Sequence, residues 1–319
     1  MLDALSLEYR PEIEHLPQAL PSVPRMSLQN DTISLPVLNQ SAGDGFVERL
    51  GSIFENAPWV AGRAASQRPF ATVADLFRAL REAIERASKE EILALLRGHP
   101  ELAFSGTMTR DSVGEQHAAG LDRLSATQRE TFDRLNKAYR EKFGFPFILC
   151  VRRHGRDSIL REFERRLNLT ADQERETALT EVLRIGALRL DQRISGPDRL
   201  SVTGRLSTHV LDTTEGRPAA GIEIELFELA SDGPHLLARA NTNADGRTDR
   251  PLIGDRPVPI AHYELRFHVR AYFRGKGHRL ADPAFLDLVP IRFGVAEPET
   301  HYHVPLLVTP WSYSTYRGS

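Results

Sequence analysis

The hydrophobic pattern of this 319-residue chain changes its period near residue 195, and this change constrains the fold more than any other feature. Before that point, apolar residues such as Phe46, Leu50 and Phe54 recur every four residues, as on one face of a helix. After it, residues 221–229 and 263–270 alternate apolar and polar side chains, which is typical of half-buried strands. We therefore expect a multidomain protein with an all-α N-terminal domain followed by an all-β antiparallel sandwich.

Turn residues and prolines indicate where these domains begin and end. Residues 1–37 contain several prolines without sustained periodicity, and we expect a poorly ordered extension there. The helical domain is predicted to span 38–192, followed by a linker over 193–204 and the β domain over 205–319. Inside the helical part, Thr72, Ser88 and Thr170 each precede an amphipathic run and are expected to be N-caps. Further helices are expected over 125–139 and 157–167.

Composition excludes several classes of partner. With 41 basic against 43 acidic residues, the chain has no basic excess that would predict binding to nucleic acid or to a membrane surface. One cysteine, Cys150, precludes an internal disulfide and fits a reducing compartment. No apolar run reaches the length of a membrane span, and the N-terminus does not read as a secretory signal. We expect a cytoplasmic protein.

Four polar motifs follow one another in the C-terminal part of the chain. They are the Ser-Thr-His run within 206–212, the Asn-Ala-Asp-Gly-Arg run within 242–249, the His-Tyr-His run within 301–307, and the terminal Tyr-Arg-Gly-Ser at 316–319. In order and spacing, residues 205–319 resemble the 5-hydroxyisourate hydrolases, a family related to transthyretin. The resemblance implies a transthyretin-like fold that hydrolyses 5-hydroxyisourate.

The same resemblance implies roles for five residues of these motifs. His209 and His303 are expected to form the acid/base pair around the attacking water, for which an imidazole is suited by its pKa of about 6.5. Arg247 is expected to polarise the carbonyl or to hold the substrate. Tyr316 and Ser319 are expected to complete the pocket. His301 and His303, two apart on one strand, would also suit a metal, but the resemblance implies chemistry without metal or other cofactor.

The helical part carries its own series of motifs. They include Ala-Pro-Trp-Val at 57–60, His-Pro-Glu-Leu-Ala at 99–103, Ser-Val-Gly-Glu-Gln at 112–116 and Lys-Phe-Gly-Phe-Pro-Phe-Ile at 142–148. Over residues 38–190 this series resembles the decarboxylases of 2-oxo-4-hydroxy-4-carboxy-5-ureidoimidazoline (OHCU), the product of the hydrolase reaction. The resemblance implies a stereospecific decarboxylation to (S)-allantoin, in which a developing negative charge is delocalised and one proton is delivered.

From this second resemblance we expect a group of site residues in the helical domain. His99 is expected to supply the proton, with Pro100 beside it in the substrate site. Glu115 and Gln116 are expected to bind the ureido and ring N–H groups, and Ser112 to add a donor. Arg189 is the best match to the arginine that holds the anionic substrate. The substrate pocket is expected to be lined by Phe147, Ile148, Leu149, Cys150 and Val151.

Two features of the helical part modify these expectations. The chain is shorter than family members between His99 and Ser112 and reads Ala-Phe-Ser-Gly at 103–106 where they have a Gly-Lys continuation. This loop is expected to be rebuilt, which affects Ser112 more than His99. Cys150 lies in an apolar run, where a thiol is typically a small buried hydrophobe rather than a nucleophile.

Together the two resemblances predict a bifunctional enzyme of urate catabolism that needs no cofactor. We expect a homo-oligomer, with a tetramer formed through the C-terminal domain and dimer contacts through the N-terminal one. Two alternatives remain. One is a small-molecule binding module on the transthyretin fold, since a fold does not fix a function. The other is an active hydrolase whose helical domain is a scaffold.

Overall fold

A computed structural model describes residues 32–103 and 108–318 of the chain, so that the extension predicted over residues 1–31 and the role predicted for Ser319 lie outside the described residues. Helices fill the first part of the described chain and strands fill most of the second, which confirms the predicted fold class. Each part has its own cluster of buried apolar side chains.

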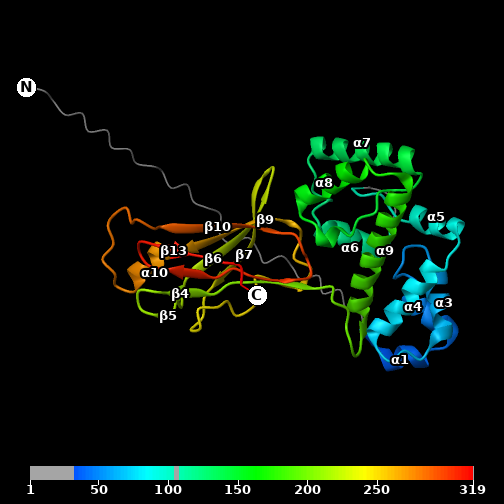
Figure 1. The fold of residues 1–319 in the computed structure, drawn as a ribbon, viewed down its shortest axis with the longest axis horizontal. Coiled ribbons are helices and arrows are strands. Elements are labelled where there is room, and N and C mark those ends of the chain that lie inside the picture. Colours follow the sequence, from blue (N-terminus) through cyan, green and yellow to red (C-terminus); the bar gives the residue numbers. More distant parts are fainter. Residues whose placement is uncertain (1–31, 104–107, 319) are drawn as a thin grey trace, which may run out of the picture. The chain divides into compact units, whose positions relative to one another are not determined.

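The helical domain is organised around α9, its longest helix, and Figure 1 shows α9 running from α7 and α8 at one end toward α1, α3 and α4 at the other. The elements in order are β1 (Ile33–Ser34), α1 (Leu35–Gln40), α2 (Gly43–Leu50), α3 (Pro58–Ala64), η1 (Ala65–Gln67), α4 (Val73–Glu85), α5 (Lys89–Arg97), α6 (Arg110–Ala118), α7 (Ala126–Phe143), η2 (Val151–Arg153), α8 (Arg156–Arg166), α9 (Ala171–Arg193) and β2 (Ile194–Ser195).

Side-chain caps fix where these helices begin. Thr72, Ser88 and Thr170 are N-caps, as predicted, and each accepts a hydrogen bond from the backbone N–H three residues later. At all three positions the later side chain bonds back to the cap's own N–H, which completes a capping box. Such a box satisfies N–H groups that the first helical turn leaves without partners. Ser125 begins α7 in the same way.

The helical domain extends beyond both of its expected ends. Residues 33–37, expected to belong to the poorly ordered extension, form β1 and the start of α1, and Leu35 is buried. The strand β1 pairs in parallel with β2, Ile33 opposite Ile194. Leu200 and Val202, expected to lie in the linker, pack against the helical core. These flanking residues join the helical domain because they bury apolar side chains against its core. They were not expected there because they show no helical period.

Two buried polar groups hold the segment 147–151, which connects α7 to η2. Arg166 of α8 donates to the carbonyl of Ile148 at 2.7 Å and pairs with Glu174 of α9, both side chains being fully buried. Glu181 of α9 accepts from the backbone N–H of Cys150 at 2.9 Å. Because this segment has no strand partner among the described residues, these side chains satisfy part of its backbone in place of a sheet.

The β domain is a sandwich of antiparallel sheet with two parallel pairings. Its four-stranded sheet has the order β10-β9-β6-β7, and the other strands form sheets of order β11-β3-β8 and β13-β12-β4-β5. The elements are β3 (Gly204–Ser207), β4 (Val210–Asp212), β5 (Arg217–Pro218), β6 (Glu223–Ala230), β7 (Gly233–Asn241), β8 (Ile253–Arg256), β9 (Ala261–His268), α10 (Val269–Gly275), β10 (Leu288–Val295), β11 (His301–His303), β12 (Leu306–Val308) and β13 (Tyr313–Ser314).

Strand pairing brings the polar motifs of this domain together. β3 runs parallel to β11 with Ser207 opposite His303, and β4 runs parallel to β12. Isolated bridges join His209 to Arg247 and His303 to Gly318. Four motifs that are far apart in the sequence therefore meet where β3 passes into β4. The helix α10 takes residues 269 and 270, which the alternating pattern assigned to a strand.

Candidate active sites

His209 lies between β3 and β4 with its ring turned into a protein environment. Its Nε2 atom is buried and has no hydrogen-bond partner among the described residues. Burial, followed by the charge of Arg247, lowers the pKa of His209, and a hydrogen bond to the backbone of Asp245 opposes this shift. The imidazole is therefore neutral at neutral pH, with a ring nitrogen left over for a molecule that enters the site.

His303, on β11, is oriented by a hydroxyl group. Its Nδ1 lies 2.9 Å from Oγ of Ser207, and the same Oγ lies 2.7 Å from Nε2 of His301. Burial, then the charges of Arg247 and His301, lowers the pKa of His303. Ser207 was not singled out in the sequence, although it stands in the Ser-Thr-His motif two residues before His209. The hydroxyl fixes the ring of His303 so that Nε2 is left for chemistry.

Two glycines allow the backbone to approach these rings. A Cβ atom on Gly246, where φ is +71°, would lie 2.4 Å from the carbonyl oxygen of Val210 and 3.1 Å from Cδ2 of His209. A Cβ atom on Gly318 would lie 2.7 Å from Cδ2 of His303, whose carbonyl accepts from the Gly318 N–H at 2.8 Å. Both motif glycines are thus required by close contact with a predicted catalytic ring.

The remaining predicted residues of this site are more open. Arg247 is exposed, and its position follows a turn in which Oδ1 of Asn243 accepts from the Arg247 N–H at 3.2 Å. Tyr316 is 59 % exposed and stands in the tail that leads to Gly318. Ser319 lies outside the described residues. The structure therefore brings His209, Arg247, His303 and the end of the tail to one place, and leaves the Tyr316 side chain on the surface.

In the helical domain, His99 ends the turn after α5 and is buried. Its Nδ1–H donates to the carbonyl of Leu95 at 2.9 Å, which leaves Nε2 as the free nitrogen. Burial lowers the pKa of His99 to about 4. The hydrogen bond to Leu95 and the charge of Glu55 raise it by less, and the charge of Arg189 lowers it slightly further. His99 is therefore neutral at neutral pH. Before it can supply a proton to a carbanion, it must first acquire one.

Arg189 of α9 is the centre of a buried ionic network. Its guanidinium donates to both oxygens of Glu115 at 2.8 Å and to Glu55 at 2.9 Å, and also to Oγ of Ser112 at 3.2 Å. A fifth and longer contact goes to the carbonyl of Ile53 at 3.5 Å. The structure thus joins three predicted residues, Ser112, Glu115 and Arg189. It also adds Glu55, which sequence reasoning missed.

Gln116 has a different set of contacts from Glu115. Its side chain is buried, accepts from the Ala103 N–H at 2.9 Å and donates to the carbonyl of Glu101 at 3.0 Å. Gln116 therefore anchors the chain that follows His99 and Pro100. The rebuilt loop predicted between His99 and Ser112 lies partly in residues 104–107, outside the described residues.

Two cavities meet at His99 and Pro100. The smaller one, about 30 Å³, is lined by these two residues and by most of the other predicted residues: Ser112, Glu115, Gln116, Phe147, Ile148, Leu149, Val151 and Arg189. The larger one, about 630 Å³, includes Glu55, Arg97 and Arg140. A cavity of this size has room for about two water molecules, so the smaller cavity does not by itself hold a ureidoimidazoline in this conformation.

Cys150 does not contribute to the walls of either cavity. Its side chain is buried, and burial raises the pKa of the thiol. A thiol of this kind remains protonated at neutral pH and is not a nucleophile. This agrees with the interpretation of Cys150 as a small hydrophobe, while its neighbours Leu149 and Val151 line the smaller cavity.

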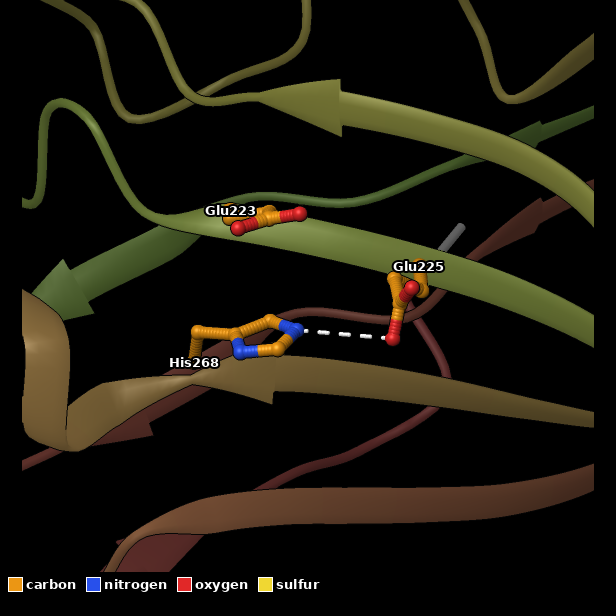
Figure 2. A group of neighbouring side chains, drawn as sticks. All are labelled: Glu223, Glu225 and His268. Atoms are coloured by element: carbon orange, nitrogen blue, oxygen red, sulfur yellow. Dashed lines mark hydrogen bonds and ion pairs between the residues drawn. The ribbon is translucent and has the colours of Figure 1, made fainter. Parts of the chain in front are cut away.

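One group of side chains in the described residues has the composition of a metal site. Glu223 and Glu225 on β6 and His268 at the end of β9 offer ligand atoms within 4.8 Å of one another. Figure 2 shows the three side chains, with a dashed line joining His268 to Glu225. Glu225 also pairs with Arg239 at 2.9 Å, which competes for its charge. None of the three belongs to either predicted site.

Among the described helices, none is long and apolar enough to cross a membrane.

Comparison with known proteins divides the chain in the same way. Residues 39–191 match the family model described as OHCU decarboxylase, and residues 206–318 match that of the HIUase/Transthyretin family. Over 120 residues the chain is 55% identical to 5-hydroxyisourate hydrolase 2 of Rhizobium meliloti, covering 38% of this chain and all of the relative. Over 163 residues it is 47% identical to the 2-oxo-4-hydroxy-4-carboxy-5-ureidoimidazoline decarboxylase of Haloferax volcanii. This match covers 51% of this chain and 97% of the relative.

A solved structure combines both parts. The crystal structure of an (S)-allantoin synthase aligns with 90% of this chain and with 100% of its own, at 34% sequence identity and a TM-score of 0.50. The similarity therefore extends over the helical domain and the β domain in one polypeptide.

Proposed function

The chain belongs to the OHCU decarboxylase family in its helical domain and to the HIUase/transthyretin family in its β domain, and we propose that it converts 5-hydroxyisourate to (S)-allantoin. The β domain hydrolyses 5-hydroxyisourate to OHCU. The helical domain then decarboxylates OHCU stereospecifically. Neither step is assigned a cofactor.

The observation that carries the hydrolase step is the buried Nε2 of His209, which has no hydrogen-bond partner in residues 32–103 and 108–318 and is close to Arg247 and His303. A neutral imidazole takes a proton from water while the water oxygen attacks the ring carbonyl. The exposed guanidinium of Arg247 stabilises the negative charge that develops on the carbonyl oxygen. A histidine of this pair then returns a proton to the nitrogen that leaves as the ring opens.

For the decarboxylase step, the support comes from the neutral state of His99 and from the Arg189 network. The substrate carboxylate approaches His99 from the larger cavity and favours protonation of Nε2. Loss of carbon dioxide leaves an electron pair on carbon, and His99 then delivers its proton to one face. Arg189 holds the anionic substrate after exchanging one of its carboxylate partners, Glu55 or Glu115, for it.

A second candidate function is favoured by two observations. The smaller cavity does not by itself hold the substrate, and the Arg189 guanidinium is fully engaged by protein groups. Both would also be expected of a helical domain that only supports an active hydrolase. The two candidates differ in whether (S)-allantoin forms faster than by spontaneous decay.

The experiment uses one variant in each domain. His303→Gln is expected to lower kcat/KM for 5-hydroxyisourate by about 10²- to 10⁴-fold while decarboxylation continues. His99→Gln is expected to abolish stereospecific decarboxylation while hydrolysis continues. Decarboxylation is followed with an excess of an independent hydrolase, so that OHCU is always supplied. If His99→Gln forms (S)-allantoin as fast as the unaltered chain, the helical domain is a scaffold.

We propose in addition that the protein is a cytoplasmic homo-oligomer, with a tetramer through the β domain and dimer contacts through the helical domain. The support is an exposed aromatic group near the C-terminus, made of Trp311, Tyr313 and Tyr316. Sedimentation equilibrium tests the proposal, since a tetramer has four times the 35.8 kDa mass of the chain. A monomer at micromolar concentration would contradict it.

A further inference from the structure

Ser207 lies between two histidines and touches a ring nitrogen of each. Its Oγ is 2.9 Å from Nδ1 of His303 and 2.7 Å from Nε2 of His301. Both histidines project from β11, which pairs in register with β3, so the parallel ladder sets these distances. The Ser207 side chain is nearly buried, whereas His301 is exposed. The three groups form a continuous hydrogen-bonded path from His303 to the surface.

A serine hydroxyl carries one hydrogen, and this restricts the protonation of the two rings. When Nδ1 of His303 donates to Oγ, the hydroxyl donates to Nε2 of His301, and Nε2 of His303 is bare. When Nε2 of His301 donates to Oγ, the hydroxyl donates to Nδ1 of His303, and a neutral His303 carries its proton on Nε2. The first arrangement makes His303 a base and the second makes it an acid.

The charged groups around the path favour neutral rings. After burial, the charge of Arg205 on β3 lowers the pKa of His301, and the charges of Arg247, His301, His209 and Arg205 lower that of His303. A surface depression of about 310 Å³ beside His301 is also lined by Asp255 and Glu299, so the outer end of the path is in contact with solvent and with two acidic residues. A proton that reaches His301 can therefore leave the protein.

We propose that Ser207 and His301 relay protons between Nδ1 of His303 and solvent during hydrolysis, an inference that rests on the proposed hydrolase function. Ser207 and His301 are positioning residues, because neither is placed against the substrate. His303 alternates between base and acid, and the relay resets its protonation without a movement of the ring.

Each step of the relay balances. Nε2 of His303 accepts a proton from water as the water oxygen forms its bond to the carbonyl carbon. The Nδ1 proton then passes to Oγ of Ser207, the hydroxyl proton passes to Nε2 of His301, and His301 releases its Nδ1 proton to solvent. His303 next donates its Nε2 proton to the leaving nitrogen, which takes the electron pair of the broken C–N bond. The three transfers reverse in the same step: Nδ1 of His303 accepts the hydroxyl proton of Ser207, Oγ of Ser207 accepts the Nε2 proton of His301, and Nδ1 of His301 takes a proton from solvent, so that His303 stays neutral.

Replacement of the outer histidine tests the path. His301→Gly in the full-length chain is expected to lower kcat/KM for 5-hydroxyisourate by about tenfold, a fraction of what a positioned acid or base contributes. Because His301 is exposed, added imidazole can take its place and is expected to raise the rate in proportion to its neutral form. The matched control is His262→Gly, an exposed histidine of β9, which is expected to keep its rate with or without imidazole.

Replacement of the hydroxyl distinguishes a relay from a structural role. Ser207→Ala is expected to lower kcat/KM for 5-hydroxyisourate by a similar factor. Added imidazole is expected not to restore its rate, because the hydroxyl that connects His301 to His303 is missing. Ser207→Thr keeps a hydroxyl and is expected to recover most of the rate. Circular dichroism and thermal unfolding of the same samples report whether the β domain of each variant is folded. Ser207→Ala is also expected to shift the acid limb of the pH–rate profile, since His303 loses an acceptor for its Nδ1 proton.

Three results would overturn the relay: an unchanged rate in His301→Gly, no response of that variant to imidazole, or equal rescue of Ser207→Ala. These outcomes differ from a failure of the proposed function itself, which would appear as full hydrolase activity in His303→Gln. Loss of activity in His303→Gln together with any of the three results leaves the hydrolase site in place and removes only the relay.

Discussion

Burial determines the protonation of histidine in both parts of the chain. His99 and His154 are buried in the helical domain, where desolvation lowers the pKa of each to about 4. His209 and His303 in the β domain are also shifted downward, and there the charge of Arg247 adds to burial. All four imidazoles are consequently neutral at neutral pH. A neutral ring can accept a proton from water or from solvent at once, which both proposed reactions require.

The same shifts predict how stability depends on pH. A pKa lowered from 6.5 to about 4 in the folded state means that the unfolded chain binds the proton more tightly between these values. The stabilisation is complete above about pH 6.5, and about 3 kcal/mol per histidine is lost as the pH falls to about 4. The free energy of unfolding, measured with urea, is therefore expected to fall less between neutral pH and about pH 5 in His154→Asn than in the unaltered chain. The control is the exposed His117→Gln, which is expected to show the same fall as the unaltered chain. If His117→Gln reduced the fall as much as His154→Asn does, the assignment to buried His154 would be wrong.

The close approach of Gly318 to His303 makes a second prediction for a single residue. Gly318→Ala adds a methyl group 2.7 Å from Cδ2 of His303, so that the ring or the tail must move. Displacement of a catalytic group by about 1 Å costs up to about 10²-fold in rate. We expect kcat/KM for hydrolysis to fall by about tenfold to a hundredfold, with decarboxylation unchanged. Gly275→Ala is the control, because a Cβ there meets nothing within 4 Å.

On the scale of elements, the segment 147–151 depends on two helices for its position. Arg166 of α8 and Glu181 of α9 bond to its backbone, and Phe147 stacks on Phe163 of α8 with ring centroids 3.8 Å apart. All residues of this segment except Cys150 line the smaller cavity, as does Arg189. The shape of the decarboxylase site is therefore set by residues that do not themselves line it.

This dependence predicts the effect of breaking the buried ion pair. Arg166→Met leaves Glu174 buried without a counter-charge and is expected to destabilise the helical domain by about 3–5 kcal/mol. Adding Glu174→Gln removes the charge and keeps an acceptor for the Tyr139 hydroxyl, which bonds to Glu174. We expect the double variant to regain most of the loss, as measured by chemical denaturation. A double variant no more stable than Arg166→Met would refute the argument.

The elements themselves were largely predictable from the sequence, because their signals are local. Thr72, Ser88 and Thr170 were predicted as caps because each directly precedes an amphipathic run, and the structure adds the capping boxes. Short elements such as α10 and β1 were not predicted. Their few residues give no clear period, and α10 directly continues the alternating run of β9.

Contacts between distant residues account for what the sequence did not reveal about the sites. Glu55 meets Arg189 across 134 positions, and its only local sign is an acidic residue beside the apolar Ile53 and Phe54. Ser207 meets His301 across 94 positions, and a pairing register that sequence alone does not provide makes this contact. Family motifs led to His99, Arg189, His209 and His303, whereas the partners that set their protonation and orientation required the fold.

For the whole molecule, the two domains supply consecutive reactions in one chain. The product of the β domain is the substrate of the helical domain, and both 5-hydroxyisourate and OHCU decay spontaneously without stereocontrol. Joining the two catalysts keeps the second near the first at every protein concentration. The benefit expected of the fusion is therefore the stereochemical purity of the product as well as the rate.

The most direct test of this account follows fresh 5-hydroxyisourate, generated from urate by urate oxidase, in the presence of the full-length protein. Ultraviolet absorbance reports its decay, and circular dichroism of the same sample reports (S)-allantoin. We predict rapid decay followed closely by the (S)-allantoin signal. Rapid decay with slow, racemic product would contradict a catalytic helical domain. Decay no faster than without protein would contradict the hydrolase site and with it the central claim.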